Sequence, residues 1–184
     1  MLADSISSDI NKMIRKIIVP SLKDNGFNKI KGRTAWGWHG DCIWVFNISA
    51  VGYFHSAITH WPSASLTVYL GIYYTYLSHI VEPKKDENGL LFPKEYECNR
   101  RAQLTCSYDQ LKYTENVKCN YSEKKRRDIW WIQPDGSNIS EVINDIKNRY
   151  LDYAVKWFWE KSNKELTLQE AERLNGHRFD EIEK

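Results

Sequence analysis

The sequence has little of what would place it in a specialised class of protein. Its 184 residues include only four cysteines, and no two of them form a C-x-x-C pair. The spacing of Cys42, Cys98, Cys106 and Cys119 fits no zinc site and no small disulfide scaffold, so we expect free, buried thiols. The apolar runs are too short to cross a bilayer. The first residues lack a basic start followed by an apolar run, so we expect no signal peptide.

An excess of charge of one sign is also missing. The chain has 26 Lys and Arg against 24 Asp and Glu, a net charge of +2. That balance does not by itself indicate a nucleic-acid partner. The sequence has no G-x-S-x-G, no glycine-rich phosphate loop and no H-E-x-x-H. We therefore predict no catalytic residue, no metal site and no cofactor, and we favour a protein that is not an enzyme.

A few pairs of reactive side chains keep the enzymatic interpretation open. Cys42 with His39 or His60 could act as a nucleophile and its base. Glu95 and Glu97 could act as an acid and base couple if they share a face of an extended segment. Nothing in the spacing requires either arrangement, and we favour a solvated loop as the explanation of the two glutamates.

Aromatic residues, in contrast, are abundant. The chain contains 8 Trp, 11 Tyr and 6 Phe, and most of these must form the core, because aromatic side chains bury large areas. The length fits one domain. We predict a single α+β domain over residues 1–162, followed by a C-terminal helical appendix over 163–184.

Two segments have the apolar period of an α-helix. The first covers residues 8–24, and Pro20 should kink or divide it. The second covers residues 138–161 and begins with a capping box made by Asn138 and Glu141. Additional apolar residues widen the C-terminal half of the second helix. That half should be buried on two sides or should contact a partner.

Other segments alternate between apolar and polar residues, which is typical of strands. The predicted strands cover residues 33–38, 42–50, 66–73, 100–107 and 128–132, and the first two form a hairpin that turns at His39-Gly40-Asp41. Residues 52–65 and 82–94 are predicted loops. The predicted fold class is α+β, an antiparallel sheet of about four to six strands with the N-terminal and C-terminal helices packed on one face.

An ordered series of short segments carries a resemblance to a known family. The segments are Leu22-Lys23-Asp24-Asn25-Gly26-Phe27, Lys31-Gly32-Arg33-Thr34, Val45-Phe46-Asn47-Ile48, Leu66-Thr67-Val68-Tyr69-Leu70-Gly71-Ile72-Tyr73, Pro93-Lys94-Glu95-Tyr96-Glu97-Cys98, Arg101 and Trp130-Trp131. In this order, over roughly residues 8 to 160, the chain resembles the bacterial family catalogued as domain of unknown function 4304. The resemblance implies a small α+β domain with an antiparallel sheet, and it implies no reaction.

The chain departs from the family pattern at two places. A Gln-Lys-Ser run tends to follow the second strand in the family, where this chain has Ser49-Ala50-Val51. Asn is usual in the family where Tyr69 stands. No role of those family residues carries over to this chain.

The face of the sheet that points away from the helices is the main candidate binding surface. Adjacent residues of a strand point to opposite faces, so polar and aromatic side chains should gather there. The candidates are Asn47, Thr67, Tyr69, Tyr73 and one of Trp130 and Trp131. Aromatic rings beside short polar side chains are typical of recognition surfaces. The alternative is that the 52–65 or 108–127 segment folds over this face and buries it.

Further candidates lie outside that face. Trp157 and Trp159 mark one end of the last long helix. Arg101 lies in a predicted strand, where a partly buried arginine would need a carboxylate partner or a ligand anion. Basic residues interleaved with aromatic ones are how proteins hold single-stranded nucleic acid. The basic candidates are Arg33, Arg100, Lys124, Lys125, Arg126 and Arg127.

The sequence therefore favours a non-catalytic, cytoplasmic bacterial protein that binds an unidentified protein partner. The contact would be the aromatic sheet face or the Trp157–Trp159 end of the helix. Antitoxin-like or defence-associated roles suit a small domain of this kind by analogy. A nucleic-acid-binding protein is the alternative, and an enzyme with an unrecognised site is the second alternative. We expect no membrane association.

Overall fold

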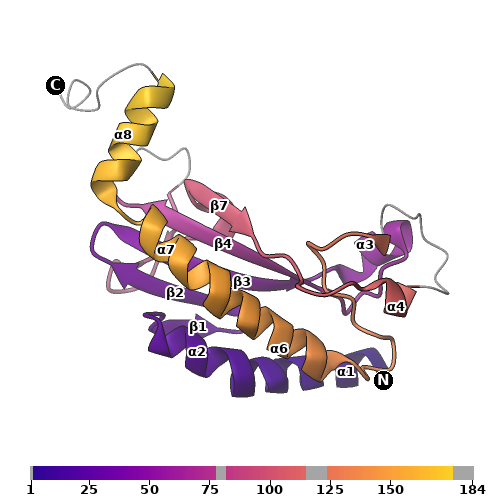
Figure 1. Ribbon diagram of the computed structural model, residues 1–184. Coiled ribbons are helices and arrows are strands. Elements are labelled where there is room, and N and C mark those ends of the chain that lie inside the picture. The colour runs from indigo at the N-terminus through magenta and orange to yellow at the C-terminus, as the bar shows by residue number, and fades with distance from the viewer. Residues whose placement is uncertain (1, 78–81, 115–123, 176–184) are drawn as a thin grey trace.

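The computed structural model describes residues 2–77, 82–114 and 124–175. A five-stranded antiparallel sheet forms the centre, in the order β1-β2-β3-β4-β7 (Figure 1). Its strands are β1 Lys29–Lys31, β2 Thr34–His39, β3 Cys42–Ala50, β4 Leu66–Tyr74 and β7 Arg100–Gln103. The strands β5 Lys84–Lys85 and β6 Leu91–Phe92 form a separate small hairpin. The sheet confirms the predicted fold class.

Alternation within the central strands decides which side chains face the helices. Strands β3 and β4 pair along nine positions, from Cys42 with Tyr74 to Ala50 with Leu66. The helix-facing set from β3 and β4 is almost entirely apolar and buried, which is why the register is fixed. The predicted hairpin between residues 33 and 50 is confirmed, because His39 pairs with Cys42 across its turn.

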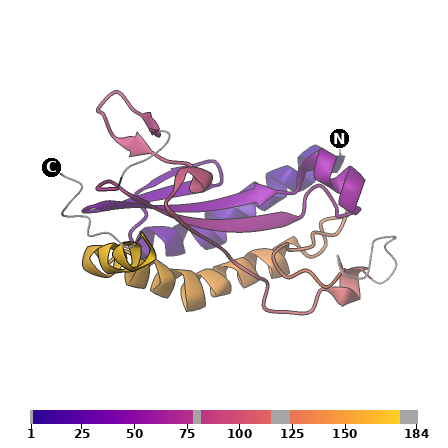
Figure 2. The same ribbon diagram turned by 90° about the horizontal axis from the view of Figure 1, so that it is seen from above.

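The N-terminal and C-terminal helical segments cover one face of the sheet (Figure 2). The first consists of α1 Leu2–Met13, the π-helical turn η1 Ile14–Ile18 and α2 Val19–Asp24. The second consists of α6 Ile139–Arg149, the π-helical turn η3 Tyr150–Ala154 and α7 Val155–Lys161. Aromatic rings fill the space between the layers, where Phe27 lies 5.4 Å from Phe158 between ring centroids.

Pro20 divides the first helix as predicted, through a change of hydrogen-bonding pattern. Proline has no N–H to donate and its ring clashes with the preceding turn. The chain adopts the wider π-helical turn at Ile14–Ile18, and α2 then starts with Pro20 in its first turn. The helix continues along the sheet, and Ile14, Ile18 and Leu22 stay buried against it.

The opposite face of the sheet is partly covered, by a segment that the sequence did not indicate. The Nε1 atoms of Trp36 and Trp38 donate hydrogen bonds to the carbonyl oxygens of Pro93 and Leu91, at 2.7 and 3.2 Å. Phe92 packs edge-to-face on both indoles. The covering segment includes β6 and the short 3-10 helix η2 Glu95–Glu97. The described residues of the 52–65 and 108–127 segments are not part of the cluster that packs there.

The region 52–65, predicted as a loop, contains the helix α3 Gly52–Thr59. Two backbone hydrogen bonds close its base, from Val51 N–H to the Ser65 carbonyl at 2.8 Å and from Gly52 N–H to the Ser63 carbonyl at 3.1 Å. Gly52 has φ +77°, a conformation that lets the chain turn from β3 directly into the helix. The helix therefore stands at the end of the β3–β4 hairpin on a closed neck.

The predicted strand around Trp130 and Trp131 is wrong. Only an isolated bridge joins Trp130 to Leu66. Trp130 is fully buried in the core beneath the helices. Trp131 is also buried, in a separate cluster with Trp61 and Ile129, so neither indole lies on the open face of the sheet.

The remaining helices are α4 Leu111–Thr114 and α8 Lys164–Asn175. Helix α8 projects from the end of the sheet (Figure 1). An ion pair between Arg100 and Glu170 joins it to β7 at 2.5 Å. Another pair joins Lys164 to Asp41 at 3.3 Å. Within the described ranges, no helix combines the length and the apolar character needed to span a bilayer.

Candidate functional site

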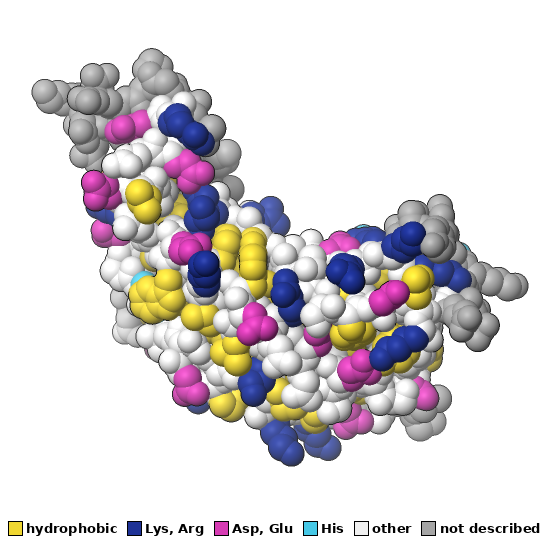
Figure 3. All heavy atoms as spheres, viewed as in Figure 1, with side chains coloured by type: hydrophobic (Ala, Val, Ile, Leu, Met, Phe, Trp, Pro, Cys, Tyr) yellow, Lys and Arg dark blue, Asp and Glu magenta, His cyan; other side chains and the backbone are white. Residues whose placement is uncertain are grey.

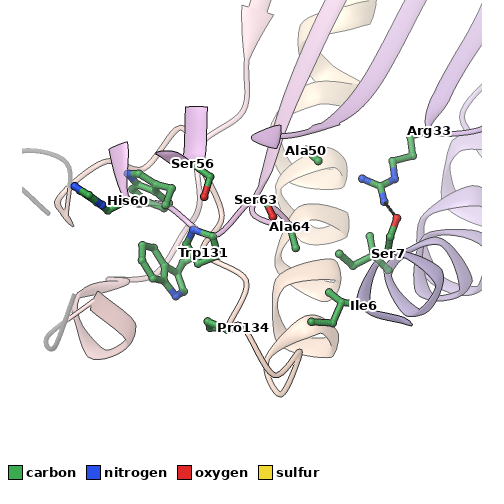
Figure 4. A pocket seen from close by; sticks show the side chains of 13 residues that line it. Ile6, Ser7, Arg33, Ala50, Ser56, His60, Ser63, Ala64, Trp131 and Pro134 are labelled. Atoms are coloured by element: carbon green, nitrogen blue, oxygen red, sulfur yellow. Dashed lines mark hydrogen bonds between the residues drawn. The ribbon is translucent and has the colours of Figure 1, made fainter. Parts of the chain in front are cut away.

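A groove of about 550 Å³ opens between α1, the β1–β2 turn and the segment that follows α3 (Figure 4). Volumes of this size are typical of ligand pockets. Its walls are apolar, with a few polar groups among them. The lining residues are Ile6, Ser7, Ile10, Arg33, Ala50, Ser56, His60, Trp61, Pro62, Ser63, Ala64, Trp131 and Pro134.

Arg33 lies at one end of this groove and His60 at the other, with Ser63 and Ala64 between them (Figure 4). Arg33 Nε donates to Asn11 Oδ1 at 2.7 Å, and its Nη2 donates to Ser7 Oγ at 3.3 Å. Both acceptors are neutral. Burial lowers the pKa of Arg33, because the charged form loses contact with water. The result is a half-buried guanidinium that α1 holds in place without neutralising its charge.

A rigid aromatic wall forms the side of the groove next to α3. Trp61 is fully buried, and its ring centroid lies 4.9 Å from that of Trp131. Gln110 fixes this wall from behind, because its Oε1 accepts from Trp131 N–H at 2.5 Å and its Nε2 donates to the Ile129 carbonyl at 2.6 Å. These buried bonds leave little freedom for the Trp131 backbone.

His60 ends helix α3 in a left-handed conformation, with φ 62°. Its N–H donates to the Ser56 carbonyl at 2.9 Å, which caps the helix. Among the described residues it is the one non-glycine residue with a positive φ. This sharp end directs the chain from α3 into Trp61, so the cap holds Ser56 and His60 at the rim of the groove.

Helix α3 exposes three large apolar side chains and buries none of its residues. Tyr53 is 79% exposed, Phe54 83% and Ile58 79%. Phe54 and Ile58 are four residues apart and share one side of the helix. Such a concentration on one short element differs from the single apolar residues scattered over ordinary surfaces.

Most of the residues predicted to form a binding face on the sheet are not free for contact. Tyr73 is buried against Ile43 and Cys98 under the 91–98 segment, so it is not available for contact. Thr67 is buried as well, and Tyr69 is half-buried. Asn47 Nδ2 donates to Thr34 Oγ1 at 2.8 Å, which leaves that polar end internally bonded.

The two tryptophans of the last long helix have different environments. Trp157 is buried in the core, whereas Trp159 is 58% exposed and contacts Trp44 with 4.8 Å between ring centroids. Of this predicted pair, only Trp159 remains accessible to a partner. Apolar side chains on this side of the molecule are interspersed with charged ones (Figure 3).

Arg101 is exposed, so the prediction of a partly buried arginine at that position is wrong. The reason is the strand register, in which Arg101 pairs with Gly71 and points away from the helices. Its neighbour Arg100 is the half-buried arginine, and Glu170 is its carboxylate partner.

The basic candidates do not form one surface. Arg33 follows β1 at one edge of the sheet and Arg100 belongs to β7 at the other. Arg126 pairs with Asp128 at 2.6 Å, Arg127 is exposed, and Lys124 and Lys125 make interactions of their own within the chain. Lysines, arginines and carboxylates alternate over the face shown in Figure 3, so no single basic stripe runs across it.

Cys42, the candidate nucleophile, is buried, and so are Cys98 and Cys106. Burial is the main cause that raises the pKa of Cys42, and it raises the pKa of Cys106 to about 11. A thiol with a raised pKa is a poor nucleophile near neutral pH. His60 lies at the groove rather than beside Cys42, whose Sγ donates to the His39 carbonyl. Cys119 lies outside the described residues.

Two further sets of side chains were candidates for metal or acid–base chemistry. Among the described residues, no three His, Cys, Asp or Glu side chains gather in a way that could hold a metal ion. Glu95 and Glu97 flank Tyr96 in η2, where Glu97 Oε2 accepts from Lys94 N–H at 2.8 Å. Glu97 thus serves as a local cap of that short helix.

A family model described as Domain of unknown function (DUF4304) matches residues 18–160. The chain belongs to this family. No curated protein and no solved structure matches it. The DUF4304 match confirms the resemblance drawn from the sequence. It includes Arg33, α3 and Trp131, while α1 and α8 lie outside it.

Two features of this DUF4304 chain escaped the sequence prediction. One is α3, although Phe54 and Ile58 have helical spacing that could have indicated it. The other is the groove, which joins α1, Arg33 and Trp131 from distant parts of the chain. No local sequence pattern predicts that these three parts lie side by side, because their proximity depends on how the helices pack on the sheet.

Proposed function

We propose that this chain is a non-catalytic, cytoplasmic bacterial protein that binds another protein, and that α3 is its principal contact. The observation that carries the proposal is the exposure of Tyr53, Phe54 and Ile58 on a helix that buries none of its residues. Transfer of a large apolar side chain out of water contributes about 1.5–3 kcal/mol. Antitoxin-like or defence-associated roles stay an analogy for such a domain.

The way in which α3 is anchored to the rest of the protein favours a binding element over a merely solvated loop. Its neck is closed by the hydrogen bonds of Val51 and Gly52, and Trp61 anchors the chain directly after it. A preorganised element loses little conformational entropy when it binds. The backbone of the helix is therefore held in place before any partner arrives.

The chemistry of α3 defines the kind of partner. The segment Gly52–Thr59 contains no Lys, Arg, Asp or Glu. A partner surface that fits it is an apolar groove, which receives side chains spaced one helical turn apart. The contact would depend on hydrophobic burial and would be only weakly sensitive to salt.

Site-specific photo-cross-linking tests this proposal. A benzophenone amino acid replaces Phe54 in one variant and Tyr96, another exposed aromatic residue, in the control. In cells that naturally express the protein, we expect position 54 to capture one protein that position 96 does not. The captured protein is then purified, and Ile58→Ser should weaken its binding about tenfold or more. Capture of lipid alone, of a second copy of this chain, or of nothing at position 54 would refute the proposal.

The nucleic-acid alternative is less well supported, because the basic candidates are spread over both edges of the sheet. A filter-binding titration against salt tests it. Phosphate contacts release counterions, so genuine binding must weaken steeply as salt rises. The absence of binding at about 50 mM salt, or binding without salt dependence, excludes this alternative.

A further inference from the structure

Arg33 is half-buried, and its side-chain hydrogen bonds go only to neutral groups. A guanidinium remains charged at any physiological pH and offers five N–H donors. Its two hydrogen bonds go to the neutral oxygens of Asn11 and Ser7, and Nη1 bonds to no described residue. Among the described side chains, no carboxylate lies within ion-pair distance of it. Its remaining donors are free to hold an anion through charge-assisted hydrogen bonds.

The groove beyond Arg33 is suited to the remainder of an anionic molecule. None of the 13 described residues that line it is acidic. Ile6, Ile10, Ala64 and Trp131 supply apolar walls along its length, and Ser63 supplies a hydroxyl group at its rim. Figure 4 shows the Arg33 guanidinium on the side of the groove where Ser7 also lies, with Trp131 on the far side of Ala64. One charged end and an apolar body match the usual composition of small-molecule pockets.

We propose that this groove is a binding site for a small organic anion, a carboxylate or a phosphate monoester on an apolar body. Arg33 holds the anionic head, Ser7 and Asn11 orient the guanidinium, and the apolar body lies against Ala64 and Trp131. This ligand is distinct from the protein partner proposed for α3. The exposed rings of α3 are not among the lining residues, so each site can be tested without the other.

Titration calorimetry with three matched probes tests the site. The probes are 2-naphthoate, 2-naphthyl phosphate and the neutral 2-naphthamide. We expect at least one anionic probe to bind about tenfold or more tightly than the amide, because a charge-assisted hydrogen bond forms only with the anion. The preference between the two anions identifies whether the natural head group is a carboxylate or a phosphate ester.

Two variants locate the binding. Arg33→Gln should weaken the anionic probes about tenfold or more and leave the amide unchanged. Arg101→Gln, on the open face of the sheet, is the matched control and should change nothing. Ser63→Phe should weaken all naphthyl probes by narrowing the groove, and it leaves Arg33 intact if Arg33→Gln proves unstable.

Three results would overturn the site. Failure of both anionic probes to bind the wild-type protein is one. Equal affinity for 2-naphthamide and for both anionic probes is another, because it removes the role of the charge. The third is unchanged affinity for the anionic probes in Arg33→Gln when its melting temperature shows that it is folded, or, if Arg33→Gln does not fold, in a folded Ser63→Phe.

Discussion

The indole Nε1 of Trp130 donates a hydrogen bond to Asp145 Oδ2 at 2.7 Å in the interior of the protein. The same carboxylate accepts bonds from the N–H and the hydroxyl group of Ser107. One buried aspartate of α6 therefore joins three segments that are distant in sequence.

Replacing this aspartate should destabilise the fold. In Asp145→Ala, the Trp130 N–H loses its acceptor in a fully buried position. We expect the free energy of unfolding to fall by about 1.5–3 kcal/mol, as found for hydrogen bonds to charged groups. Urea denaturation measures the loss. Asp152→Ala, at an exposed position of the same helical segment, is the control and should stay within about 0.5 kcal/mol of the wild type.

Substitutions in α3 should barely change stability, whereas a substitution of the tryptophan that follows it should greatly reduce stability. Phe54→Ser removes a side chain that is almost entirely in water, so we expect a change within about 0.5 kcal/mol. Trp61→Ala removes a fully buried ring and should cost about 3–5 kcal/mol. Thermal and urea unfolding measure both. A large loss in Phe54→Ser would show that α3 is packed by its own chain and would contradict its proposed role.

Replacing the two tyrosines of the open sheet face should destabilise the protein to different extents. Tyr73 is buried under the 91–98 segment, and Tyr73→Ala should cost about 3 kcal/mol or more. Tyr69 is only half-buried, so Tyr69→Ala should cost about 1 kcal/mol. Equal and small effects in the two variants would mean that the 91–98 segment does not cover this face.

The attachment of α8 should depend on pH. The hydrogen bond from Arg100 holds the pKa of Glu170 below its ordinary value. A lowered pKa in the folded state means that the contact contributes fully above the ordinary glutamate pKa, about 4.3, and is lost as the pH falls through the lowered value. We expect amide protection in α8, corrected for intrinsic exchange rates, to decrease over that acidic range.

Variants isolate this effect. Glu170→Gln should remove the pH dependence and leave α8 less protected at neutral pH. Glu165→Gln, which changes another glutamate of the same helix, should keep the wild-type profile. An unchanged profile in Glu170→Gln would show that Arg100 does not hold the helix through this carboxylate.

Much of the fold could be predicted from local patterns. The apolar period of residues 8–24 and 138–161 located both long helical segments, and alternation located β2, β3 and β4. The features that failed depend on distant contacts. Trp130 lies in a segment that pairs with β4 at one residue only, so its periodicity did not produce a strand. Tyr73 was predicted to be accessible, because no local sequence pattern indicates that Phe92 and Cys98 pack against that face.

The candidate site was less predictable than the fold for the same reason. Arg33 was identified as a basic residue, yet its significance arises from Ser7 and Asn11 on α1. Arg101 and Arg100 are adjacent, and only the strand register decides which of them is buried. The spacing of Phe54 and Ile58 was the only local sign of α3, because a helix that buries none of its residues has no core-facing apolar period.

The closed neck of α3 has a consequence for how this protein could diversify. Because Val51 and Gly52 bond to Ser65 and Ser63, the residues between them form an insertion at the tip of a hairpin whose strands are already in register. Lengthening, shortening or rewriting that insertion shifts no pair of β3 and β4. A new recognition surface can thus be acquired at the tip while the aromatic interior stays the same.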